Sequence, residues 1–86
     1  MNLNGTWINQ EQVAQINLMY QKSDDYLLKY HYDGNDYKNE EIVPINRSNG
    51  KIFHIMKSTM FGNCSVSIID EQNIIIGNTH FQKIIV

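Results

Sequence analysis

Short runs in which apolar and polar residues alternate one by one constrain this chain more than any other feature. The alternation has a period of two almost throughout, and clusters of Gly, Asn, Asp and Ser interrupt it. Successive side chains of a β-strand point to opposite faces, so the pattern indicates strands with one buried and one solvated face. Interruptions about every eight to twelve positions are typical of a sandwich or a barrel.

The alternation predicts eight strands joined by short turns. The strands are expected at 5–8, 12–20, 26–32, 38–45, 51–59, 64–69, 74–76 and 79–85, and the main turns at 23–25, 33–35, 46–50, 61–63, 70–73 and 77–78. Pro44 lacks an N–H, so we expect it at an edge, a bulge or a strand end. Short connections favour pairing between sequence neighbours. We therefore predict an all-β fold, an antiparallel meander of about eight short strands forming a small closed or partly open barrel.

The length of the chain allows only one hydrophobic core. A chain of 86 residues is too short for two, so residues 1–86 are predicted to form a single domain. An eight-stranded barrel is just wide enough to be filled by its own side chains. The residues expected to point inward are bulky: Ile16, Leu18, Tyr20, Leu28, Tyr30, Val66, Ile68 and Phe81.

Charge and hydropathy narrow the classes of partner. Seven Lys and Arg oppose nine Asp and Glu, so general attraction to phosphate backbones is absent and we predict no nucleic-acid partner. No stretch approaches the roughly 20 apolar residues of a membrane-spanning helix, and the first residues lack the basic and apolar regions of a secretory signal. The single cysteine, Cys64, cannot form an internal disulfide. We expect a cytoplasmic protein with no membrane association.

Residue types that carry chemistry are scattered along the chain. His31, His54 and His80 lie on different predicted strands, without the spacing that presents two metal ligands together. Cys64 alternates with apolar residues, as a small buried side chain does. Neighbouring carboxylates such as Glu40 and Glu41 point to opposite faces of a strand, which makes them poor acid–base partners. We predict no metal, no cofactor and no enzymatic activity.

A tryptophan follows a glycine by two positions near the start of the chain. The stretch Gly5-Thr6-Trp7 resembles the Gly-x-Trp signature on the first strand of lipocalin, fatty-acid-binding and avidin-like barrels. The resemblance implies that Trp7 closes one barrel end and that a basic residue of the last strand packs over its indole, a place that Lys83 matches. Those families usually have Arg there, and their barrels are longer.

The layout is also similar to that of short uncharacterised bacterial proteins of conjugative elements, a likeness that implies no activity. Without either likeness, Trp7 is an ordinary core aromatic. Both interpretations make Trp7 a structural residue.

The later strands hold more apolar residues than one small interior needs. In 51–56, Ile52 and Met56 face one side while Phe53 and Ile55 face the other, and adjacent apolar residues recur at 68–69, 74–76 and 84–86. The outward members form the candidate binding surface: Phe53, Ile55, Ile69, Ile75 and Ile84. We expect this surface to contact another protein or a second copy of the chain, as in a dimer. The alternative is that these five residues are isolated exposed apolar side chains, which are common on the surfaces of monomeric proteins.

These observations favour a non-enzymatic protein-binding module of the inhibitor, immunity or accessory type. The alternative function is a lipocalin-like carrier of a small apolar ligand, which requires a void lined by Tyr30, Met56 and Phe81. The two functions differ in whether the barrel interior is filled or empty.

Overall fold

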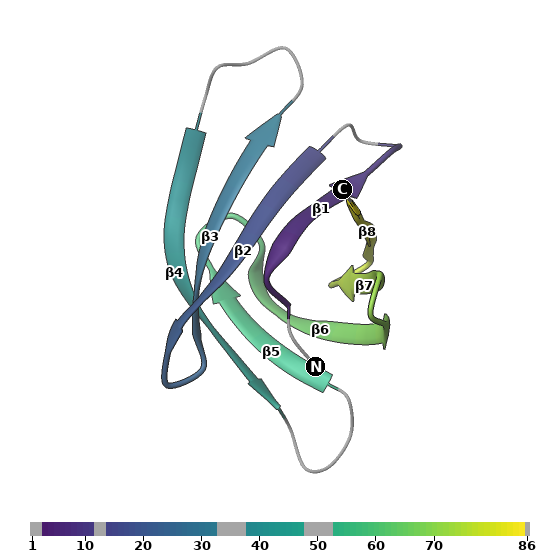
Figure 1. Cartoon of the computed structure of the whole chain (residues 1–86). Coiled ribbons are helices and arrows are strands. Elements are labelled where there is room, and N and C mark those ends of the chain that lie inside the picture. Colours follow the sequence, from purple (N-terminus) through teal and green to yellow (C-terminus); the bar gives the residue numbers. More distant parts are fainter. Residues whose placement is uncertain (1–2, 12–13, 33–37, 48–52, 86) are drawn as a thin grey trace.

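The computed structural model describes residues 3–11, 14–32, 38–47 and 53–85 and shows eight β-strands (Figure 1). In chain order these are β1 (Gly5–Asn9), β2 (Ala14–Lys22), β3 (Asp25–Tyr32), β4 (Lys38–Arg47), β5 (Phe53–Ser58), β6 (Gly62–Asp70), β7 (Asn73–Ile76) and β8 (Thr79–Lys83). Consecutive strands pair antiparallel, and β1 also pairs with β8. The predicted all-β meander is confirmed, and the barrel is closed.

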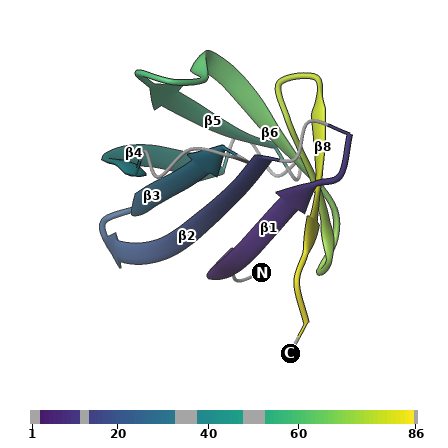
Figure 2. The ribbon, with the colours of Figure 1, turned by 90° about the horizontal axis from the view of Figure 1, so that it is seen from above.

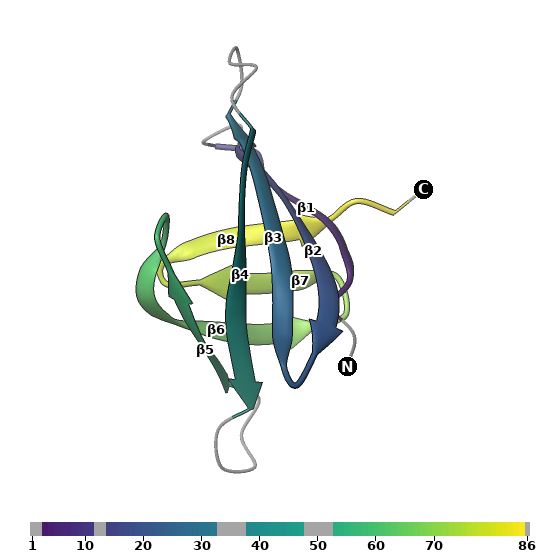
Figure 3. The same ribbon diagram turned by 90° about the vertical axis from the view of Figure 1, so that its left-hand side faces the viewer.

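The barrel has two walls whose strands run in crossing directions. One wall consists of β2, β3 and β4, and the other of β6, β7 and β8 (Figures 2 and 3). β1 and β5 connect the walls at their sides. Among the residues described, no helix is long and apolar enough to cross a membrane.

The core lies between these walls and receives apolar side chains from every strand. Its buried members are Leu3, Trp7, Ile16, Leu18, Tyr26, Leu28, Tyr30, Val43, Ile45, Met56, Val66, Ile68, Ile74, Ile76 and Phe81. All of the residues predicted to point inward belong to this core except Tyr20. The period-two pattern therefore identified inward residues correctly on β2, β3, β6 and β8, whereas the inward residues of β4, β5 and β7 were not assigned from it.

Tyr20 was predicted to be buried, and this prediction was wrong because its side chain is 46% exposed. β2 continues to Lys22, and its register with β3 shifts between Tyr20 and Lys22. The shift comes after Tyr20, which still pairs with the core residue Tyr26 and so lies on the inner face, but near the end of the hairpin, where its side chain remains exposed. Its ring stands edge-on to that of Tyr26, with centroids 5.4 Å apart.

Several strand boundaries differ from those predicted. β4 extends through Asn46 and Arg47, which were expected in a turn, and β8 ends at Lys83 instead of residue 85. The β5–β6 turn occupies 59–61, and Gly62 begins β6 with a φ of 74°. The predicted turn at 33–35, together with residues 12–13 and 48–52, lies outside the described residues.

Pro44 lies inside β4, opposite Asp25 of β3. The Ile45 N–H donates to the Asp24 carbonyl oxygen at 2.9 Å, so the alternation of the backbone turns the Pro44 nitrogen towards β5. The register between β4 and β5 begins at Ile45. Pro44 therefore lies where one ladder ends, although the strand itself continues.

Replacement of a core isoleucine should destabilise the barrel far more than replacement of an outer one. Ile74 is fully buried, so Ile74→Ala should lower the free energy of unfolding by about 2–5 kcal/mol. The matched variant Ile55→Ala, at an exposed strand position, should cost less than about 1 kcal/mol. Urea denaturation of both variants measures the difference. Equal costs would contradict the assignment of the inner and outer faces.

Candidate functional site

Trp7 lies at the seam where the barrel closes. Its side chain is 1% exposed, and the indole Nε1–H donates to the Leu3 carbonyl oxygen at 3.0 Å. Lys83 is opposite Trp7 in the β1–β8 register, and the Lys83 Nζ lies 5.6 Å from the centroid of the indole ring. The basic residue of the last strand thus lies over the buried tryptophan.

Gly5 leaves the room that the Lys83 side chain occupies. A Cβ atom at this position would lie 2.6 Å from Lys83 Cε, and the Gly5 φ of +142° is one that residues with a Cβ rarely adopt. Gly5 and Trp7 therefore both contribute to the contact between the Lys83 side chain and the indole ring. Gly5 lets the lysine stem pass, and Trp7 presents its ring to the ammonium group.

The five candidate binding residues all lie on outward positions of the second half of the barrel or just beyond it. Phe53 and Ile55, on β5, are 44% and 46% exposed, and Ile69 at the end of β6 is also exposed. Ile75 on β7 is half-buried, and Ile84 follows the end of β8.

Phe53, Ile55 and Ile75 share the outer face of β5–β7 without forming one continuous apolar patch, whereas Ile69 falls at a register shift of β6 and Ile84 lies beyond β8. Ser67 of β6 lies between Phe53 and Ile75 in the register, and Ser65 lies opposite Ile55. His80 follows Ile75 on the next strand. The surface therefore has apolar side chains separated by hydroxyl and imidazole groups.

A second set of outward apolar residues was missed in the sequence. Met19 of β2 pairs with Leu27 of β3, and Leu27 pairs with Ile42 of β4, so the three form one cross-strand row. Met19 is 49% exposed and Ile42 is 63% exposed, while Leu27 is half-buried. Each of the three is adjacent in sequence to an inward apolar residue, which is the same pattern that identified the outward residues of the later strands. Only the register shows that the three are neighbours across strands.

His54 is an inward-facing polar residue on β5, two positions before the core residue Met56. Neither of its ring nitrogens has a hydrogen-bond partner among the described residues, and both are inaccessible to solvent. Burial lowers the pKa of His54, and the Arg47 guanidinium on β4 lowers it further. The backbone of Ile45 and the Asp24 carboxylate act in the opposite direction with a smaller effect. The imidazole is therefore held in its neutral form.

Glu41 of β4 holds the β5–β6 turn in place. Its carboxylate accepts hydrogen bonds from the Ser58 hydroxyl and from the Thr59 N–H, the latter at 2.8 Å. The Ser58 Oγ in turn accepts from the N–H of Phe61 at 2.9 Å. Burial alone would raise the pKa of Glu41, but the hydrogen bonds from Ser58 and Thr59 outweigh it, and the pKa is lowered. This cluster is explained by the turn that it stabilises.

The remaining reactive groups form no metal centre in the part of the chain that the structure describes. Burial raises the pKa of the Cys64 thiol, which keeps it protonated and weakly nucleophilic. No group of three or more His, Cys, Asp or Glu among the described residues could hold a metal ion. A surface hollow of about 260 Å³ beside β1 and β8 is lined mainly by neutral polar side chains, including Asn9, Thr79 and Gln82.

Comparison with protein-family models, with curated proteins and with solved structures found no match to this chain. The geometry of the molecule therefore carries the functional argument.

Gly5→Ala should destabilise the barrel by about 1–3 kcal/mol through the strained φ, and the new Cβ should displace the flexible Lys83 side chain from its place over the indole. Lys83→Ala should cost about 0.5–1 kcal/mol through loss of the contact with the indole. In the double variant the steric conflict is absent, so the two costs should fall short of additivity by at least about 0.5 kcal/mol. Chemical denaturation followed by Trp7 fluorescence measures all three. Strict additivity would show that the lysine stem does not cross Gly5.

His54 should make the barrel less stable in mild acid. Its folded-state pKa lies below the ordinary value of 6.5, so the unfolded chain binds the proton first as the pH falls. Stability from this residue is retained above about pH 6.5 and decreases below it, by at most about 1.4 kcal/mol per pH unit. Urea denaturation between pH 7.5 and 5 should show this decrease in the wild type and a smaller one in His54→Leu. Equal slopes in the two proteins would contradict the inward placement of the ring.

Proposed function

We propose that this domain is a non-enzymatic protein-binding module whose binding surface is the outer face of β5, β6 and β7. The observation that carries the proposal is the exposure of Phe53 and Ile55, two large apolar side chains at successive outward positions of β5. Aromatic and aliphatic anchors surrounded by a polar rim are typical of protein interfaces. Ser65 and Ser67 are the polar neighbours of Ile55 and Phe53 on β6.

The closed barrel determines how such a partner would be recognised. Each strand has two neighbours in the barrel, although the β4–β5 register covers only Ile45–Arg47 of β4. On the outer face of β5, β6 and β7, recognition would depend on the side chains that project from these paired strands. Phe53 and Ile55, with the partly exposed Ile75, are the apolar groups on this face that a partner would cover.

The alternative is a carrier of a small apolar ligand, as a lipocalin- or avidin-like barrel would be. A closed eight-stranded barrel with a buried Trp7 beneath Lys83 is compatible with that architecture. Tyr30, Met56 and Phe81, which would line the ligand site, are buried members of the core. The Phe61 ring also stands edge-on to both Tyr30 and Phe81, with centroid distances of 6.2 Å and 6.3 Å. This packing favours binding on the outside.

Affinity capture with immobilised protein tests the proposal. Wild type should capture a partner from extracts of the native host, and Ile55→Asp should reduce its recovery at least tenfold by quantitative mass spectrometry, because a charge replaces an apolar contact. Ile42→Asp adds the same charge at an exposed isoleucine on the opposite wall and should leave capture unchanged. Equal recovery with all three proteins would overturn the proposal, as would an apolar ligand that co-purifies with the folded barrel in native mass spectrometry.

A further inference from the structure

The pairing between β1 and β8 stops before β8 reaches its first residue, and a hollow lies beyond the last pair. Among the described residues the register contains Trp7–Lys83 and Ile8–Gln82, although β8 begins at Thr79. The surface hollow of about 260 Å³ is bordered by residues of 8–11 on one side and of 78–82 on the other. β1 and β8 meet at this seam of the barrel (Figure 2). The hollow therefore lies where main-chain pairs no longer hold the seam together.

Asn9 is a buried polar residue that lines the hollow. Its side chain is 8% exposed, and its Nδ2 donates to the His80 carbonyl oxygen at 2.7 Å. A side-chain amide thus connects the two segments where a further main-chain pair would have continued the ladder. The N–H and carbonyl of one residue in an antiparallel strand point to the same side, so the His80 N–H also faces β1. The register supplies no main-chain partner for it from the described part of β1.

The side chains around the hollow can donate and accept hydrogen bonds, but they carry little charge. Asn78 and Gln82 contribute amide groups, and Thr79 contributes a hydroxyl group. Among the described residues that line the hollow, Glu11 is the only acid, and none is Lys or Arg. An anionic ligand would therefore meet a carboxylate and no fixed cation, which is unfavourable.

The two basic side chains of β8 are engaged elsewhere. Lys83 places its Nζ 5.6 Å from the centroid of the Trp7 ring, in the paired part of the seam. The His80 Nε2 lies 2.9 Å from the Asn73 Oδ1, and the Asn73 Nδ2 donates to the Asp70 carboxylate at 2.9 Å. The imidazole is therefore hydrogen-bonded to β7. The environment of the hollow is thus neutral to weakly acidic.

We propose that this hollow binds a single neutral sugar ring. Sugar hydroxyl groups both donate and accept hydrogen bonds, as do the amide and hydroxyl groups of Asn78, Gln82 and Thr79. An ionised carboxylate has two acceptor oxygens, so Glu11 can accept from two adjacent hydroxyl groups of one ring. The half-buried Ile8 offers an apolar contact to the C–H groups of the ring. The site is separate from the partner surface on β5, β6 and β7.

The volume of the hollow limits the ligand to one ring. A water molecule takes up about 30 Å³ of liquid, so the hollow has the volume of roughly nine waters. One pyranose ring with its hydroxyl groups is smaller than this, whereas a disaccharide is larger. Binding exchanges hydrogen bonds to water for hydrogen bonds to protein, so the net gain is modest. We expect a dissociation constant on the order of 1 mM.

An NMR titration of the ¹⁵N-labelled protein tests the proposal. D-glucose, D-galactose and D-mannose are each added up to about 50 mM, well above the expected dissociation constant. At least one of them should shift the side-chain amide signals of Asn78 and Gln82 in a saturable manner. Glucuronate, which adds a carboxylate to the glucose ring, should bind at least about fivefold more weakly than glucose because it meets Glu11. Glu11→Gln should reduce this discrimination.

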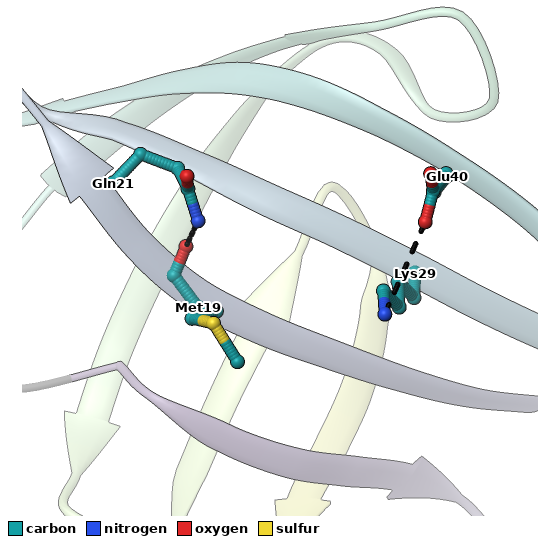
Figure 4. Close-up of polar contacts among 4 residues, drawn as sticks. All are labelled: Met19, Gln21, Lys29 and Glu40. Carbon is teal, nitrogen blue, oxygen red and sulfur yellow. Dashed lines mark hydrogen bonds and ion pairs between the residues drawn. The ribbon is translucent and has the colours of Figure 1, made fainter.

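Variants of the lining residues locate the site. Glu11→Ala and Gln82→Ala should each weaken binding of the sugar at least about fivefold, because each removes hydrogen bonds to the ring. Figure 4 shows two matched controls on the opposite wall: Glu40, whose Oε2 lies 3.9 Å from Lys29 Nζ, and Gln21, whose Nε2 donates to the Met19 carbonyl oxygen. Glu40→Ala and Gln21→Ala should bind the sugar like the wild type. The dispersion of the amide signals establishes that each variant is folded.

Three results would overturn the proposal: no saturable shift with any of the three sugars, unchanged binding in Glu11→Ala and Gln82→Ala, or glucuronate that binds as tightly as glucose. Ile55→Asp should bind the sugar like the wild type, since Ile55 lies on β5, away from the hollow. Glu11→Ala should still capture the protein partner. Failure of sugar binding and failure of the proposed function are therefore separate outcomes.

Discussion

Pairing between β1 and β8 is the interaction on which the rest of the structure depends. It brings Trp7 opposite Lys83 and Ile8 opposite Gln82, and the Ile84 N–H extends it by donating to the Thr6 carbonyl oxygen at 2.8 Å. With this seam closed, every strand has a neighbour on each side, and each has one inner and one outer face. The contact between Lys83 and the indole lies at the same seam, so closure of the barrel and burial of its tryptophan occur together.

Closure also limits how the molecule can interact. Main-chain groups that the edges of an open sheet would expose are paired along the registers of the barrel, and aromatic and aliphatic side chains form its core. The outer faces of the two walls carry different apolar residues and point in opposite directions (Figures 2 and 3).

Much of the fold could be predicted from the sequence, and the exceptions have local causes. Alternation identified eight strands and the inward residues of β2, β3, β6 and β8, because the side-chain period of a strand is a local property of the backbone. It did not show that Tyr20, which lies on the inner face opposite Tyr26, is near the end of the hairpin and therefore exposed. It also missed the role of Phe61, which was expected in a turn and whose ring packs between Tyr30 and Phe81.

The sequence by itself determined the inward residues of β2, β3, β6 and β8, that the fold is a meander, and that apolar residues remain for the outside. The Gly-x-Trp stretch of the first strand can also be recognised without the structure. Only the tertiary structure decided that the barrel closes, that Lys83 passes over Gly5, and that Met19, Leu27 and Ile42 form one row. The physical reason is that alternation repeats within a strand, whereas neighbours across strands depend on register. Turns and core packing set the register jointly, over many residues of chain.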